Sequence, residues 1–128
     1  MANQVTNIGG MLSAVTTTFA YTDSTAVAIA MIPAGAQIVD INIDVTTAFN
    51  AASTNTVTVG KTGSAAAFVA ATSVGTAGRA SVATTGVYSA WANVGTSDVY
   101  ATITYSQTGT AASAGAARVT IVYKYADV

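Results

Sequence analysis

Residues 37–47 read QIVDINIDVTT, a stretch in which apolar and polar side chains alternate. The apolar parity comprises Val39, Ile41, Ile43 and Val45, and the polar parity comprises Asp40, Asn42 and Asp44. Successive side chains of a β-strand point to opposite faces of its sheet, so a period of two indicates a half-buried strand. This stretch therefore predicts a strand whose apolar parity faces a core and whose polar parity faces solvent.

Other short apolar runs, separated by turn residues, recur about every ten residues along the chain. They occupy residues 12–21, 25–32, 56–59, 65–72, 80–84, 87–94, 98–106 and 115–125. The run at 25–32 is expected to place Val27, Ile29 and Met31 on one face and Ala26, Ala28 and Ala30 on the other. The last two runs, which flank the low-complexity tip 106–116, are expected to pair as a hairpin. This pattern predicts a single-domain antiparallel β-sandwich or small barrel of about eight short strands.

Composition favours the same all-β class. Ala, Thr and Val supply 66 of the 128 residues, whereas Leu occurs once and Glu does not occur. Thr and Val are branched at Cβ and suit a pleated sheet, and the missing Leu and Glu are strong helix formers. Residues 1–11 are polar and end in two glycines, so we expect an extended N-terminal arm over 1–11 and the sandwich domain over 12–128.

The residue inventory excludes several classes of chemistry. Without Cys or His the chain has no disulfide, no thiolate nucleophile and no imidazole base, so we expect no enzyme, catalytic residue or cofactor. Asp40 and Asp44 lie four strand residues apart, roughly 13 Å, which is too far for both to bind one metal ion. Four Lys and Arg residues cannot neutralise many phosphates, so no nucleic-acid partner is expected.

No stretch of the sequence reads as a targeting or membrane segment. No positive charge precedes an apolar run at the start of the chain, as a signal peptide would require. The most apolar run, 26–32, ends at Pro33 and falls far short of the ~20 residues of a membrane span. We therefore expect no membrane partner and synthesis in the cytoplasm, with release by lysis if the protein leaves the cell.

Several strand-and-turn segments resemble the small β-sandwich virion proteins of tailed bacteriophages. The segments are residues 25–36, 38–49, 54–60, 98–106 and 115–125, roughly three quarters of the chain. The resemblance implies a jelly-roll-like sandwich, and it implies a structural protein of the virion that was made in the host cytoplasm. None of the matching positions is a chemical site, so the resemblance transfers no functional residue.

Within this group, we expect a head decoration or cement protein that binds the outside of a capsid and stabilises it. Its expected partners are the phage major capsid protein and copies of itself, as a homotrimer. The alternative is a fibre or receptor-binding module, in which the tip 106–116 or exposed tyrosines contact a host glycan. The expected interface residues are Asn3, Val5, Ile8, Ala26, Ala28, Ala30, Tyr100 and Arg118.

Overall fold

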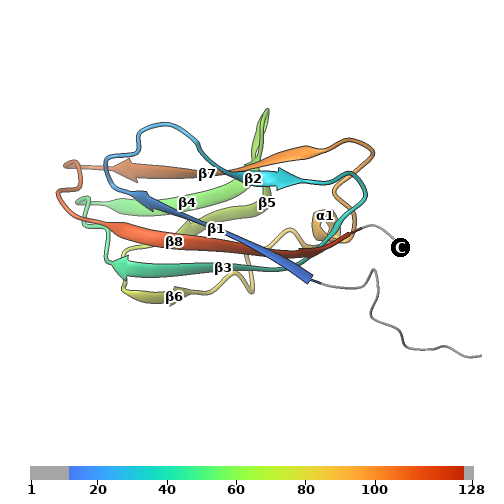
Figure 1. The fold of residues 1–128 in the computed structure, drawn as a ribbon. Coiled ribbons are helices and arrows are strands. Elements are labelled where there is room, and N and C mark those ends of the chain that lie inside the picture. Colours follow the sequence, from blue (N-terminus) through green and yellow to red (C-terminus); the bar gives the residue numbers. More distant parts are fainter. Residues whose placement is uncertain (1–11, 126–128) are drawn as a thin grey trace, which may run out of the picture.

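The structure, a computed structural model, describes residues 12–125, which form eight β-strands and one helical turn (Figure 1). The elements are β1 (Leu12–Ala20), β2 (Val27–Ile32), β3 (Gln37–Thr47), β4 (Thr54–Lys61), β5 (Ser64–Ser73), β6 (Gly78–Ala80), α1 (Tyr88–Trp91), β7 (Val99–Thr108) and β8 (Ala116–Lys124). The two predicted runs at 80–84 and 87–94 are therefore not strands. Strand β6 ends at Ala80, and α1 replaces the second run.

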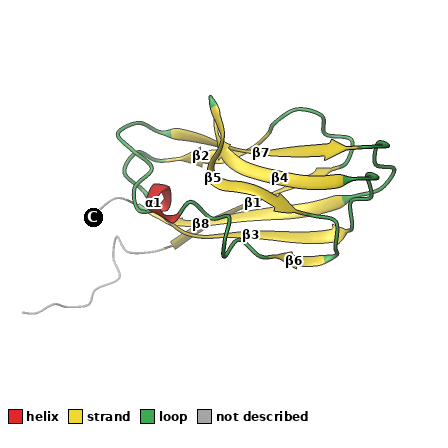
Figure 2. Ribbon diagram, turned by 180° about the vertical axis from the view of Figure 1, so that it is seen from behind, coloured by secondary structure: helices red, strands yellow, loops and turns green. Residues whose placement is uncertain are grey.

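The strands form two four-stranded antiparallel sheets that pack face to face (Figure 2). The order in one sheet is β1-β8-β3-β6, and the order in the other is β2-β7-β4-β5. The hydrogen-bonded pairs β1–β8, β2–β7, β3–β6 and β4–β5 are nested, as if one long hairpin had been folded over into two layers. This nesting is the jelly-roll topology, and it confirms the predicted single-domain antiparallel sandwich of about eight strands.

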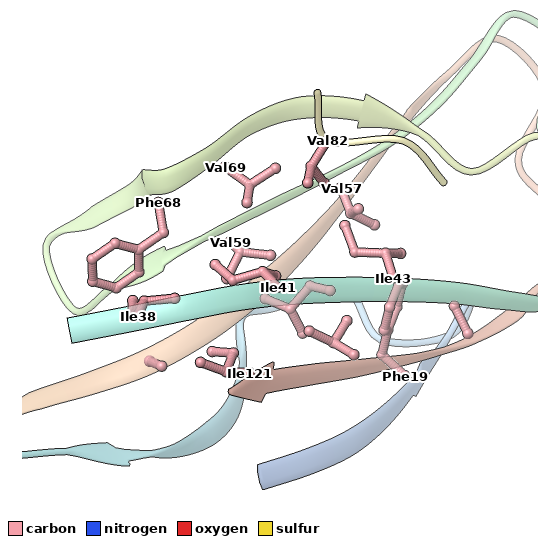
Figure 3. Packing of buried hydrophobic residues seen from close by; sticks show 14 of the residues in the cluster. Phe19, Ile38, Ile41, Ile43, Val57, Val59, Phe68, Val69, Val82 and Ile121 are labelled. Atoms are coloured by element: carbon pink, nitrogen blue, oxygen red, sulfur yellow. The ribbon is translucent and has the colours of Figure 1, made fainter. Parts of the chain in front are cut away.

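The core fills the space between the sheets with the alternate side chains that the sequence pattern predicts (Figure 3). Ile41 and Ile43 on β3 and Ile121 on β8 have no exposed surface. Asp40, Asn42 and Asp44 lie on the opposite, outer face of β3, as predicted. The same alternation runs along β7, where Val99, Ala101, Ile103 and Tyr105 are all buried.

A β-bulge in β3 overturns one inward assignment. The pairing of β3 with β8 shifts register between Ile38 and Asp40, which leaves Val39 as the extra residue. Ile38 is 3% exposed and occupies the core, whereas Val39 is 45% exposed. The prediction that Val39 points inward is therefore wrong, because a bulge reverses the parity of every residue before it.

A second bulge lies in β2, between Ala28 and Ala30. Ala28 pairs with Thr102 on the outer face, but Ala30 pairs with the buried Ala101, so these two alanines lie on opposite faces. Met31 pairs with Tyr100 and is exposed, which corrects its predicted place beside Val27.

The expected hairpin of the last two strands is also wrong. Strand β7 pairs with β2 and β4, whereas β8 pairs with β1 and β3 in the other sheet. Residues 109–115 therefore connect the two sheets across one end of the sandwich (Figure 1). Within β7 and β8 alternation indicates the face that a side chain occupies, but it does not specify the partner strand.

The sandwich has two distinct ends (Figure 1). We call the α1 end the one formed by residues 33–36, α1 and the segment 92–98, the start of β1 and the end of β8. The hairpin tip 62–63 projects from its sheet beside the start of β7, where Thr62 N donates to Tyr100 O. The opposite end carries the connections 21–26, 48–53, 74–77 and 109–115. This division is important because the two ends expose different side chains.

Candidate interaction surface

The outer face of the β1-β8-β3-β6 sheet carries two cross-strand ion pairs. Arg79 Nη2 lies 3.2 Å from Asp40 Oδ2, and Arg118 Nη2 lies 2.7 Å from Asp44 Oδ2. On the same face, the hydroxyls of Thr16 on β1 and Thr120 on β8 share a hydrogen bond of 3.0 Å. Each carboxylate thus pairs with an arginine, and no group of acidic side chains in residues 12–125 is arranged to hold a metal ion.

The outer face of the β2-β7-β4-β5 sheet carries mostly small, uncharged side chains over β2 and β7. Neither β2 nor β7 contains a charged residue. Alternate outward positions on β7 carry Thr102 and Thr104, and Ala28 lies beside Thr102 on β2. On these two strands, the large exposed hydrophobic side chains are Met31 and Tyr100, which lie where the sheet reaches the α1 end.

The predicted interface residues do not form one patch. Ala26, Ala28 and Tyr100 are exposed near β2 and β7, whereas Ala30 is turned toward the core side of its sheet. Arg118 is exposed on the other sheet, where it pairs with Asp44. The remaining three, Asn3, Val5 and Ile8, lie outside the described residues.

Large exposed hydrophobic side chains lie around the α1 end. Among the described residues, six such side chains are exposed: Leu12, Met31, Val39, Tyr88, Tyr100 and Tyr125. Leu12, Met31, Val39 and Tyr100 lie near strand ends, Tyr88 begins α1, and Tyr125 follows β8. They do not form one patch, because Leu12 lies on the outer face of one sheet and Met31 and Tyr100 lie on the outer face of the other. The loops of the opposite end carry none of them, so exposed apolar surface marks one end of the molecule.

Sequence reasoning missed most of these residues. It placed Val39 on the inward face and Met31 on the same face as Val27 because it did not detect the bulges. A signal was present, since Met31-Ile32 and Ile38-Val39 are adjacent large apolar pairs that interrupt alternation. Such a pair at a strand end is the pattern that a bulge produces.

Hydrogen bonds hold the loops of the α1 end together. Gly35 N donates to Gly95 O at 2.7 Å, Val94 N donates to Ala36 O at 3.0 Å, and Ala34 N donates to Asp98 Oδ1 at 2.9 Å. These bonds join the turn at 33–36 to the segment at 93–98. The α1 end therefore presents a surface with a defined shape rather than two independent loops.

A hollow of about 430 Å³ lies beside the hairpin tip at this end. Lys61 and Thr62 line it from the tip, and Asp98 and Tyr100 line it from the start of β7. Lys61 and Asp98 line the same hollow but form no salt bridge, unlike the two Arg–Asp pairs of the described chain. The segment Gly60-Lys61-Thr62, which resembles the end of a phosphate-binding loop, is the β4–β5 hairpin and precedes no helix.

Two tyrosines meet where β8 ends. The rings of Tyr123 and Tyr125 are 5.8 Å apart and nearly perpendicular. Burial raises the pKa of the Tyr123 hydroxyl, with a further increase from Tyr125 beside it. The Tyr123 phenol is therefore neutral near pH 7 and buried, whereas the ring of Tyr125 is exposed beside it.

Trp91 is not available to join the exposed tyrosines in a glycan-binding surface. Trp91 is 6% exposed, and its Nε1 donates a 2.8 Å hydrogen bond to Phe68 O. Trp91 is thus a core residue, and Tyr100 is exposed without it. No helix in residues 12–125 is long and apolar enough to cross a membrane.

Neither a protein-family model nor a curated protein sequence matches the chain. Two solved structures share its fold. One is a chain from the cyanophage Pam1 capsid asymmetric unit, with a TM-score of 0.70 and 22% identity, covering 97% of this chain and 91% of that one. The other is a chain from the acidic stable capsid structure of Helicobacter pylori bacteriophage KHP30, with a TM-score of 0.64 and 12% identity, covering 94% and 92%. At these identities the likeness establishes the jelly-roll sandwich.

Proposed function

We propose that this protein is a structural component of a bacteriophage virion that decorates the outer surface of the capsid and stabilises it. The observation that carries the proposal is the fold: two similar chains both come from phage capsid structures, and the likeness extends over more than nine tenths of each chain. The chain's own surface supports the same role. It combines a flat, uncharged sheet face with a rim of exposed large side chains, as a protein that adheres to other proteins requires.

The low positive charge of the chain favours a position on the outside of the capsid over one on its inner surface, next to the genome. The chain has four Lys and Arg residues against five Asp, and two of the four cations are paired with Asp40 and Asp44. A surface that contacts packaged DNA needs cations that release counterions from phosphates. With a net charge of −1, this chain suits the exterior.

We further propose that the protein assembles as a homotrimer. Only 7% of the residues are charged, and six large hydrophobics are exposed within residues 12–125, so a lone 12.6 kDa chain would leave more apolar surface in water than monomers of this size usually do. Association with two copies of itself would cover part of that surface, and three copies suit the threefold positions of an icosahedral shell.

Phage particles assembled with the gene deleted test the role directly. We expect particles that lack the protein to release DNA at a lower temperature than wild-type particles, and purified protein added back to restore the wild-type value. Microscopy of the restored particles should show density on the outer surface in groups of three. Equal DNA retention with and without the protein would contradict the cement role and favour the fibre alternative, which is present in few copies.

We also propose that residues 1–11 take part in binding. They immediately precede Leu12, the first residue of β1. Deleting residues 2–9 is expected to leave the melting temperature of the free protein unchanged within about a degree, because surface changes outside the core have small effects. Occupancy on deleted-gene particles should fall. A deletion variant that occupies particles as fully as the wild type would contradict this part of the proposal.

A further inference from the structure

The edge strands of the sandwich differ in how far they are protected. Within residues 12–125 the edges are β1 and β6 in one sheet and β2 and β5 in the other (Figure 1). A free edge can pair with another chain, and proteins usually block it with a bulge, a charge, a covering segment or a short strand. Strand β6 has three residues and carries Arg79, and β2 contains a bulge. Backbone hydrogen bonds of 2.8 Å join residues 85–87 to Phe68 and Ala70, so this segment covers part of the edge of β5.

Strand β1 has none of these protections. Its nine residues, LSAVTTTFA, include no charged residue and no proline. They pair with β8 one by one, from Leu12 opposite Lys124 to Ala20 opposite Ala116, without a shift of register. Among the described residues, β8 is the strand partner of β1 in its sheet. The other edge of β1 is therefore long, regular and uncharged.

The hydrogen bonds at the end of β1 show which backbone groups lie on this edge. In an antiparallel sheet, alternate residues direct both their N–H and their C=O to the same neighbouring strand. Tyr21 N donates to Gly115 O at 3.1 Å, so the odd-numbered residues face β8. Ala20 N donates instead to Asp23 Oδ2 at 2.7 Å, as expected if the even-numbered residues face away from β8. The free groups ahead of that bond belong to Leu12, Ala14, Thr16 and Thr18.

From these observations we infer that the free edge of β1 pairs with β1 of a second copy of the chain, antiparallel, across a twofold axis at Val15. In this register Leu12 lies opposite Thr18 of the other copy, and Ala14 lies opposite Thr16. All four residues of the free row then exchange backbone hydrogen bonds, and the bond from Ala20 N to Asp23 is left intact. Val15, which is half-buried on the inward face, meets Val15 of the other copy and gains apolar cover.

The side chains of β1 favour a second copy over a foreign segment. A partner must supply an extended, uncharged stretch of the same length, and β1 of another copy already has one. Because β1 carries no charge, two copies do not repel each other at this edge, and the small or hydroxyl-bearing Ala14, Thr16 and Thr18 fit together on the outer face. The pairing joins the two β1-β8-β3-β6 sheets into one of eight strands.

The contact is small. Seven paired residues at about 3.4 Å each, across sheets packed about 10 Å apart, cover roughly 240 Å², against the roughly 800 Å² that one partner buries in a standard interface. The pairing is therefore weak and forms where copies are concentrated. A twofold contact cannot close a ring of three, so it is separate from the trimer contact proposed above and joins one trimer to another.

Engineered cysteines trap the pairing, because the chain has no cysteine of its own. Val15→Cys should form a covalent dimer on mild oxidation, since the twofold axis places the two thiols directly opposite each other. Ala14→Cys and Thr16→Cys should each dimerise poorly alone, because equal residues are then diagonal neighbours about 7–8 Å apart. A mixture of these two variants should give the mixed dimer. The control Val122→Cys lies on the same outer face but on β8, one strand away from the edge, and should give no dimer.

Charge placed on the outer face tests the same register in the Val15→Cys background. Ala14→Lys with Thr16→Lys puts like charges opposite each other twice and should slow dimer formation about fivefold. Ala14→Lys with Thr16→Glu differs at one side chain, puts opposite charges together, and should restore the rate. Both pairs of changes remove the hydrogen bond between Thr16 and Thr120, so that loss does not distinguish them. Circular dichroism establishes that each variant is folded.

The results decide between this pairing and other occupants of the edge. The predicted cysteine pattern, with slowing by the lysine pair and rescue by glutamate, supports the inference. Equal dimer formation by Val122→Cys, or faster dimer formation by Ala14→Cys alone than by the mixture, overturns it. Dimer formation by Val15→Cys only after residues 2–9 are deleted would show that the chain's own N-terminal segment occupies the edge, which also overturns it. Every measurement uses the free protein, so its outcome is independent of whether the protein binds a capsid.

Discussion

Truncating Ile38 to Ala is expected to lower the free energy of unfolding by about 2–5 kcal/mol, whereas truncating its neighbour Val39 changes it by less than about 0.5 kcal/mol. Ile38 is 3% exposed and its removal leaves a cavity in the core, while Val39 is 45% exposed on the bulge. Strict alternation along residues 37–47 predicts the reverse order. The free energies of unfolding of the two variants in urea therefore test whether the bulge is present.

The same experiment has an internal reference. Ile41→Ala and Ile121→Ala remove side chains with no exposed surface and should also cost about 2–5 kcal/mol. Asn42→Ala, on the outer parity of β3, should stay within about 0.5 kcal/mol of wild type. A large loss at Val39 with a small loss at Ile38 would show that the register of β3 before Asp40 is wrong by one residue.

Replacing Gly115 by Ala should destabilise the fold by at least about 2 kcal/mol. The residue has φ +149°, a conformation that L side chains rarely adopt, and an added Cβ would lie 2.6 Å from Phe49 Cγ. Phe49 cannot retreat easily, because its ring lies 5.4 Å from Phe19 and 4.7 Å from Tyr105 in the core. Backbone strain and overpacking therefore add together, each contributing about 1–3 kcal/mol.

Gly63→Ala is the matched control for Gly115→Ala. Gly63 lies at the β4–β5 hairpin tip with φ +85°, and no atom lies within 4 Å of an added Cβ. That variant has the backbone strain without the clash, so thermal unfolding should show a clearly smaller loss. Equal losses in the two variants would mean that contact with Phe49 contributes nothing.

The sequence carried enough information to predict the sandwich and the inward residues of its regular strands. Ile41, Ile43 and Ile121 are buried as alternation predicts, because a period of two directly reports which face a side chain occupies. Alternation does not indicate which strands are neighbours. It therefore could not show that β7 and β8 lie in different sheets and pair with other strands. Nor could it reveal bulges, which change parity without changing composition.

Long-range packing explains the remaining differences. Residues 87–94 have strand-like composition, but Trp91 and Val94 are drawn into the core while Trp91 Nε1 bonds to Phe68 O, twenty-three residues earlier. A four-residue helical turn has too little local stability to be predicted from propensity alone. The candidate surface was missed for a similar reason, since Met31 and Val39 are exposed only because of bulges that depend on their partner strands.

The nested strand order also constrains when the chain can fold during synthesis. Strand β1 has β8 as its only partner in its sheet, and β8 separates β1 from β3. Thr16 and Thr120, which share a hydrogen bond, are 104 residues apart. At translation rates of about 5–20 residues per second, β8 emerges from the ribosome roughly 5–20 s after β1. The β1-β8-β3-β6 sheet is thus completed only after β8 has been translated, and until then the edges of β1 and β3 that pair with β8 are open to other nascent chains.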